Sequence, residues 1–402
     1  MDAASKHFGC AIIGSSPLSL LEALHQRRMG RRVVVIEGAE SLGGAWRERS
    51  VFGFPRVEIG PHVITFNAET YDYFARELAV EMIPMQPVPM YLIPTPFGRL
   101  RLSYHFSPFL AYLTVPFHFL TNPAYRERFA ELKEEYFGRM SDAAGLIQRW
   151  LFSSEKPRLL YPRGGTIELM DRITGQVKKA GIKVLLSSEV TQLRRVADET
   201  VAVRLGDRTI TTDHVFLTRH QRLGSVVSGS EEHRIGYECR SYTMLHLLVA
   251  SALPPQISYA LAKRHPIFNL ISDLTAYLPE PPSSGLRLIT VRLLNWPGAR
   301  DRAGVEEFVR SLRADRTLAA DAELRQFEFS EYEQGLLSRD SKAAIRTLLG
   351  EAVTIFKSTN FSGSIGDQVA RWRRKKISAE KLSAFGRRSR DASPRDLPVH
   401  IS

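Results

Sequence analysis

Cysteine is almost absent from this chain, and long apolar runs are absent altogether. Two residues of 402 are cysteine, Cys10 and Cys239, too few for a disulfide framework or a conventional zinc site. Isolated cysteines suit a reducing compartment, so we expect a cytoplasmic protein. Residues 1–9 lack the apolar core of a signal peptide. No segment offers the roughly 18 uninterrupted apolar residues that a membrane-spanning helix needs.

The most apolar segment, residues 105–120, is interrupted by Pro108, Pro116 and His118. An aromatic-rich segment of this kind can insert shallowly into a membrane surface. It can equally line an internal substrate cavity or fill the core of a second domain. All three interpretations stay open, and peripheral membrane contact through this segment is one of them.

Charge of one sign predominates, with a formal net charge of +12. The densest basic cluster consists of Arg371, Arg373, Arg374, Lys375 and Lys376, followed by Arg387, Arg388 and Arg390. Such a cluster can meet an anionic nucleotide or an acidic membrane face. It lacks the interleaved series of aromatic residues typical of a base-stacking surface, so we expect no nucleic-acid partner. The simplest interpretation is a solvated basic tail.

Length predicts more than one domain, because 402 residues exceed the size of an ordinary single core. Near the N-terminus, the apolar run 8–13 predicts a buried parallel strand. A turn at 14–17 precedes helical apolar spacing over 18–28, and Gly30 suits the end of that helix. The β-branched residues 33–36 predict a second strand. Together these segments predict a βαβ unit.

The turn of this unit has the pattern Gly14-x-Ser16-x-x-Ser19. A dinucleotide-binding fingerprint has glycine at all three positions, for the tight turn, close approach of the pyrophosphate, and helix packing. Here two glycines are missing, but serine is small and its hydroxyl can donate to a phosphate. Glu37 ends the second strand, where an acidic residue accepts hydrogen bonds from ribose hydroxyls. Its position favours a nucleotide site over a merely structural βαβ unit.

Farther along, further elements are predicted from periodicity and residue type. Helices are expected at 69–80, 124–151, 166–180 and 305–313, and strands at 182–186, 189–195, 201–205, 214–218, 244–250 and 286–294.

Several of these residues occur in motifs that resemble a known family. Ala11-Ile-Ile-Gly14, Val33-Val-Val-Ile-Glu37 and Leu42-Gly43-Gly44 are similar to the opening of the flavin-dependent amine oxidase and protoporphyrinogen oxidase superfamily. Gly60-Pro61-His62-Val63-Ile64 resembles its UDP-galactopyranose mutase branch.

Later segments extend this resemblance. Tyr161-Pro162-Arg163-Gly164-Gly165-Thr166 is similar to the glycine pair that lies near the isoalloxazine ring, and Ser188-Glu189-Val190 to the strand whose backbone meets the adenine. His214–Thr218 resembles the strand that returns to the nucleotide domain. Gly366-Asp367 resembles the closing pair that holds the flavin pyrophosphate, although an ordinary capped helix explains it equally well.

The resemblance implies an α/β fold, with a Rossmann-like FAD/NAD(P)-binding domain and a second, mixed α+β substrate or cap domain. We expect residues 1–80, 160–225 and 345–380 in the first domain, 81–159 and 226–344 in the second, and a basic tail over 381–402. FAD is the implied cofactor. Its expected contacts are Gly14, Ser16, Ser19, Glu37, Gly43, Gly44, Gly60, His62, Gly164, Gly165, Val190, Gly366 and Asp367.

Three functions are compatible with these motifs. The first is an FAD-dependent oxidoreductase acting on a small, apolar or amine-bearing substrate held between the domains. A flavin-dependent sugar-nucleotide mutase and a non-catalytic scaffold that retains the fold are the alternatives. His62 and Arg163 are expected to face the ring, but a turn cap and a surface ion pair explain them as well. No metal cluster is recognisable, and neither catalytic residues nor oligomeric state can be assigned.

Overall fold

The computed structural model describes most of residues 7–103 and 159–356. Gaps within those ranges fall at 47, 59–63, 66–70, 96–97, 198–199, 219–220, 263–264, 274, 279–280, 284 and 297. Outside them, it describes residues 144, 147–148, 151, 369, 372–373 and 376. The apolar segment 105–120 and the tail 381–402 therefore lie outside the described residues. No helix in the described part of the chain is long and apolar enough to cross a membrane.

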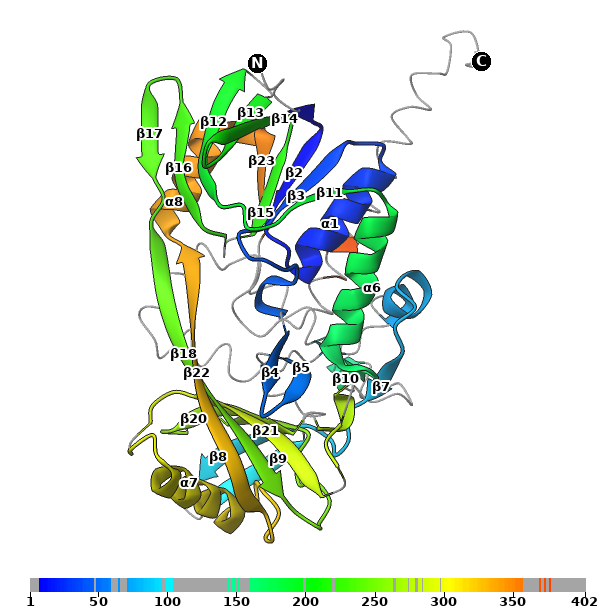
Figure 1. Cartoon of the computed structure of the whole chain (residues 1–402), viewed down its shortest axis with the longest axis vertical. Coiled ribbons are helices and arrows are strands. Elements are labelled where there is room, and N and C mark those ends of the chain that lie inside the picture. Colours follow the sequence, from blue (N-terminus) through cyan, green and yellow to red (C-terminus); the bar gives the residue numbers. More distant parts are fainter. Residues whose placement is uncertain are drawn as a thin grey trace, which may run out of the picture.

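A five-stranded parallel sheet forms the N-terminal part of the fold (Figure 1). Its order is β11 (Lys183–Leu185), β3 (Val33–Ile36), β2 (Cys10–Ile13), β15 (Val215–Thr218) and β23 (Val353–Phe356), and every neighbouring pair is parallel. Helix α1 (Pro17–Arg28) connects β2 to β3. The predicted βαβ unit and the Rossmann-like α/β fold are thus confirmed.

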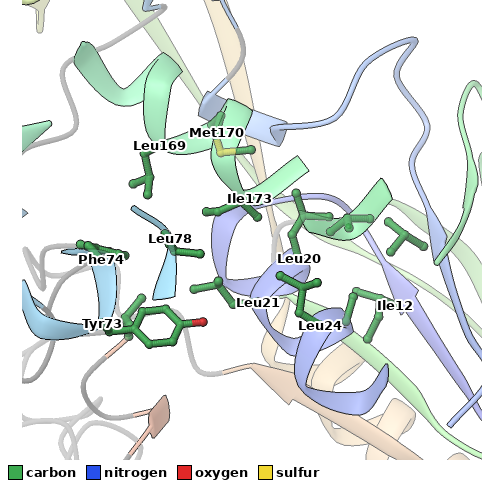
Figure 2. Close-up of a cluster of buried hydrophobic side chains, with 14 of the residues drawn as sticks. Ile12, Leu20, Leu21, Leu24, Tyr73, Phe74, Leu78, Leu169, Met170 and Ile173 are labelled. Atoms are coloured by element: carbon green, nitrogen blue, oxygen red, sulfur yellow. The ribbon is translucent and has the colours of Figure 1, made fainter. Parts of the chain in front are cut away.

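The core beside this sheet is built by α1 and by α6 (Gly165–Lys179). Leu20, Leu21 and Ile173 meet between the two helices, and Figure 2 shows this packing. A one-turn π-helix, η2 (Tyr73–Glu77), lies where a longer helix was expected and adds Tyr73 to the cluster. Each fully buried side chain of this size contributes about 1.5–3 kcal/mol. This packing fixes where the N-termini of α1 and α6 lie.

A six-stranded mixed sheet adjoins the parallel one. Its order is β1 (His7–Phe8), β14 (Arg208–Thr212), β13 (Thr200–Leu205), β12 (Val190–Ala197), β16 (Leu223–Ser228) and β17 (Glu231–Arg234). β14 was not predicted; it follows β13 through a tight turn at Gly206, whose φ of +60° favours glycine. Helix α8 (Arg339–Leu349), also unpredicted, packs on this part of the core.

A seven-stranded sheet forms the second part of the molecule. Its order is β22 (Glu323–Leu337), β18 (Tyr237–Ala250), β21 (Leu286–Leu293), β20 (Phe268–Asp273), β19 (Tyr259–Ala262), β8 (Met90–Thr95) and β9 (Gly98–Ser103). Helix α7 (Arg302–Ala314) buries Val305, Phe308 and Leu312 in the core of this part. The long strands β18 and β22 run between the two parts (Figure 1). Only 244–250 of β18 had been predicted.

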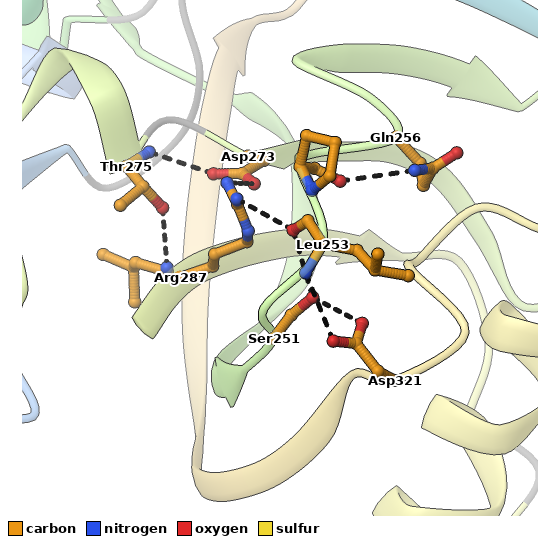
Figure 3. Close-up of polar contacts among 9 residues, drawn as sticks. Ser251, Leu253, Gln256, Asp273, Thr275, Arg287 and Asp321 are labelled. Atoms are coloured by element: carbon orange, nitrogen blue, oxygen red, sulfur yellow. Dashed lines mark hydrogen bonds and ion pairs between the residues drawn. The ribbon is translucent and has the colours of Figure 1, made fainter. Parts of the chain in front are cut away.

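Polar contacts close one end of this sheet, as Figure 3 shows. The Asp321 carboxylate accepts from Ser251 Oγ at 2.6 Å and from Ala252 N at 2.7 Å, and the Ser251 hydrogen bond lowers its pKa. Asp273 lies 3.4 Å from Arg287, but burial raises the pKa of the Asp273 carboxyl. The Asp321 carboxylate thus satisfies the backbone N–H of Ala252 in the loop after β18.

Smaller elements complete the fold. They are a three-stranded sheet of β6 (Ile64–Thr65), β10 (Leu159–Pro162) and β7 (Met82–Pro84), the hairpin β4 (Glu48–Val51) and β5 (Phe54–Glu58), and the 3₁₀ turns η1 (Gly44–Trp46), η4 (Thr275–Tyr277) and η5 (Gly350–Ala352).

The end of the basic cluster is packed against the fold. Glu22 of α1 is completely buried, and its carboxylate accepts from Trp372 Nε1 at 2.5 Å and pairs with Lys376 Nζ at 2.7 Å. The Arg373 guanidinium lies over the Tyr73 ring. A solvated tail is therefore the wrong interpretation for these residues, because a buried carboxylate requires the cation and the indole donor.

Candidate functional site

The first glycine turn joins β2 to α1 and contains Gly14. Its φ is +90°, a conformation that L side chains rarely adopt, and its N–H donates to Ile36 O at 2.7 Å. The parallel register places the end of β2 beside the end of β3. The turn glycine and the first residue after β3, Glu37, therefore meet at one edge of the sheet, as predicted.

Glu37 is buried and holds this turn together. Its Oε2 accepts from Ser15 N at 3.0 Å and Ser15 Oγ at 2.5 Å, and its Oε1 accepts from Ala39 N at 2.9 Å. A carboxylate has about four acceptor positions, and these contacts use three. Glu37 therefore has one acceptor position left, which could accept a hydrogen bond from a ribose hydroxyl.

Ser15, which the sequence did not single out, links Glu37 to the next loop. Its Oγ accepts from Gly43 N at 2.9 Å while donating to Glu37. Gly43 and Gly44 both have positive φ, and a Cβ added at Gly44 would lie 3.6 Å from Ser16 N. The Gly43–Gly44 loop is thereby brought against the turn, as the resemblance implied.

Ser16 and Ser19 were expected to contact the cofactor, and that role remains a prediction. In the structure both have a local structural role at the start of α1. Ser16 is the N-cap of α1, and its Oγ accepts from Ser19 N at 3.3 Å and lies 2.8 Å from Ser19 Oγ. Ser19 is buried, as the third position of the fingerprint requires for close packing. The first N–H groups of a helix have no acceptor within the helix, and capping by Ser16 uses one of them, the Ser19 N–H.

Val190 lies beside the same edge. Ser187 N donates to Ala39 O and Ser188 N to Glu37 O, so the segment leading into β12 runs along the loop after β3. Val190 is buried and begins β12. The structure thus brings the segment before Val190 next to Glu37. The role of Val190 as the backbone contact for adenine remains a prediction.

The second glycine turn begins α6, with Gly164 as the N-cap and Gly165 at φ +74°. The buried Glu58, at the end of β5, accepts from Thr166 N at 3.1 Å and from the Tyr161 hydroxyl. Nothing in the sequence pattern pointed to Glu58. A negative charge at this helix start is favoured by the free N–H groups and the helix dipole.

A pocket opens beside this turn, at the junction with the seven-stranded sheet. Its walls are Val57, Glu58, Gly165, Ile167, Tyr277, Leu278, Leu288 and Thr290. The Tyr161 and Tyr277 rings pack edge to face with centroids 4.9 Å apart. Most of this lining is apolar, Glu58 and Thr290 supply polar groups, and the cavity has room for little more than one water molecule.

His246 lies behind Thr290, with Nδ1 3.1 Å from Thr290 Oγ1 and Nε2 3.4 Å from Ser330 Oγ. The imidazole is completely buried, and burial lowers its pKa to about 4. It is therefore neutral at physiological pH, and the polar wall of the pocket carries no positive charge from this residue.

Arg163 does not point toward this pocket. Its guanidinium pairs with Glu81 through contacts of 2.6 and 2.7 Å, and its side chain is 61 % exposed. The surface ion pair considered for it from sequence is the one observed. Gly60, His62, Gly366 and Asp367 lie outside the described residues, so their predicted roles stay predictions.

The residues present fit the nucleotide half of FAD. A glycine in the left-handed region, a buried carboxylate with a remaining acceptor position, and the N-terminus of α1 converge on one edge of the parallel sheet. This arrangement, joined to a second sheet by two long strands, defines a two-part α/β protein with a Rossmann-like domain.

Two family models match parts of the chain. A model of the NAD(P)-binding Rossmann-like domain matches residues 12–77, and a model of flavin containing amine oxidoreductases matches residues 102–222. Both matches agree with the resemblance to flavin-dependent amine oxidases noted in the sequence. No curated protein matches it in sequence.

Solved structures share the fold at low identity. Cyclohexylamine oxidase from Brevibacterium oxydans IH-35A has a TM-score of 0.58 at 14% identity, covering 94% of this chain and 99% of its own. Putrescine oxidase bound to putrescine has 0.55 at 13%, covering 90% and 95%. A RAB GDI from Plasmodium falciparum has 0.56 at 9%, covering 92% and 98%. These similarities show the fold and leave the substrate undetermined.

Proposed function

We propose that this chain is an FAD-dependent oxidoreductase of the amine oxidase and protoporphyrinogen oxidase type, acting on a small organic substrate. The supporting observation is Glu37, buried at the end of β3 and locked against the Gly14 turn by Ser15 and Ala39. A carboxylate in this position is what an adenosine ribose requires.

Bound FAD would supply the redox chemistry, and the protein would supply binding and orientation. Glu37 and the first turn would hold the adenosine diphosphate part. The Gly164–Gly165 turn would lie near the ring, beside the pocket between α6 and the seven-stranded sheet. As it stands, the pocket has room for little more than one water molecule, so an apolar or amine-bearing substrate would meet only its rim, where Glu58 and Thr290 are the polar groups.

The test is the visible spectrum of the purified protein, followed by a search for released FAD after heat denaturation. We expect about one FAD per chain, or its uptake on incubation with excess FAD. Glu37→Ala should weaken FAD binding by at least about tenfold, because it removes a charged hydrogen-bond acceptor. Glu40→Ala is the matched control, because Glu40 is exposed in the same loop.

Two results would contradict the proposal. A colourless protein that takes up no FAD would favour a scaffold that keeps the fold without the cofactor. Equal FAD affinities of the Glu37 and Glu40 variants would remove the ribose site from this position. Protection by a UDP-sugar only after reduction of the flavin would instead indicate a sugar-nucleotide mutase.

A further inference from the structure

Gln221 lies over the first glycine turn although it is more than 200 residues away in sequence. β15 pairs with β2 in parallel, with Leu217 opposite Ile13, so the two strands end at the same edge of the sheet. Gln221 follows β15 and its backbone N–H donates to Thr218 O at 3.2 Å. A Cβ added at Gly14 would overlap the Gln221 carboxamide. The side chain therefore packs directly on Gly14.

The turn itself offers few N–H donors to an anion. Ser15 N is bound by Glu37, Ser19 N is bound by Ser16 Oγ, and Pro17 has no N–H. A phosphate group at the start of a helix depends on such donors. Ser16 N and Leu18 N are the amides of this turn that remain beside those contacts, so a diphosphate here would gain from a further donor outside α1.

Gln221 can provide that donor. Its carboxamide carries two N–H groups and no charge. The one side-chain hydrogen bond that the described residues give it runs from Nε2 to Thr218 Oγ1, at a long 3.3 Å. The side chain is half-buried and only weakly held, so it can turn toward a ligand without breaking a strong contact.

We propose that Gln221 is a diphosphate-binding residue, whose side-chain amide supplements the few backbone donors left at this turn. The inference rests on the proposed function, since it concerns the same nucleotide site. It assigns the residue a binding role toward the phosphates and none in catalysis.

The experiment compares the affinities of the intact protein and its variants for FAD, ADP and adenosine, measured by calorimetry with cofactor-free protein. Gln221→Ala should weaken ADP and FAD about tenfold, because a hydrogen bond to a charged group is lost. Gln221→Glu should weaken them about a hundredfold, because it also places a negative charge against the phosphates. Adenosine affinity should not change, because adenosine has no phosphate.

Gln256→Glu is the matched control. Gln256 is also half-buried, its Nε2 also has a local oxygen at 3.3 Å, and it lies in the second part of the molecule. The control should bind all three ligands as the unaltered protein does. Thermal melting of each variant reports on folding.

The alternatives give distinct results. If Gln221→Ala binds ADP as tightly as the unaltered protein, Gln221 does not contribute to binding. If the variant binds ADP more tightly, Gln221 obstructs the site. Either result shows that the inference is wrong while the proposed function stands. Equal losses for adenosine and ADP would show distortion of the turn and would also overturn it. Absence of FAD and ADP binding to the unaltered protein would overturn the proposed function and this inference together.

Discussion

Helices α1 and α6 both begin at a glycine turn beside a buried glutamate, yet the two turns face different surroundings. At the first turn, Glu37 is bound by Ser15 and Ala39, and the loop of Gly43 closes over it. At the second, Glu58 is bound by Thr166 and Tyr161, and the turn lines a pocket. The first turn is held by local backbone and serine contacts, and the second by contacts between distant elements.

This difference separates two kinds of sequence change. Glycine-to-serine substitution has been accommodated at the first turn, because Ser16 forms an N-cap and Ser19 still packs tightly. At the second turn, Gly165 lies against the backbone carbonyl of Tyr277 in the neighbouring part of the molecule, whereas Gly164 faces the Glu168 side chain. A Cβ at Gly165 would therefore meet a backbone atom that cannot swing away, whereas a Cβ at Gly14 would meet the Gln221 side chain, which can.

The largest effect is expected at Glu58. Glu58→Ala leaves the Thr166 N–H and the Tyr161 hydroxyl buried without this acceptor, and the free energy of unfolding should fall by about 4 kcal/mol. Urea denaturation measures it. The control is Glu168→Ala, which loses the hydrogen bond from Gly164 N and a long 3.8 Å ion pair with Arg172 at a partly exposed carboxylate, and should cost about 1 kcal/mol. Similar costs for the two variants would mean that Glu58 does not hold the second turn.

Next in size is the difference between glycines. Gly165→Ala should lower the unfolding free energy by about 3 kcal/mol, because it adds backbone strain at positive φ and a Cβ only 2.8 Å from Tyr277 O. Gly14→Ala should cost about 2 kcal/mol, because the Gln221 side chain can swing away. Gly30→Ala, at φ +80° with open space around it, measures strain alone at about 1 kcal/mol. Any other order of the three losses in unfolding free energy would contradict the distinction between a movable side-chain neighbour and a fixed backbone neighbour.

Local signals in the sequence explain what could be predicted. The β2–α1–β3 unit, α6 and the position of Glu37 follow from apolar periodicity, turn residues and the end of a strand, all within about 30 residues. Glu58 and Gln221 carry no such signal. Each acquires its role through a strand or helix far away in sequence, and only the pairing of β15 with β2 and the packing of α6 bring them to the turns.

The smallest effect separates adjacent serines of the first turn. Ser15→Ala removes the hydroxyl that joins Glu37 to Gly43 N, two buried contacts, and should cost about 2 kcal/mol. Ser16→Ala removes only the N-cap of α1 and should cost about 1 kcal/mol. Chemical denaturation of both variants, matched in size and one residue apart, measures the difference. If Ser16→Ala were the more damaging, capping of α1 would outweigh the Ser15–Glu37 contact. The first turn would then be stabilised mainly by the Ser16 N-cap, as at an ordinary helix start. The Glu37 carboxylate could then bind a ligand without destabilising the fold.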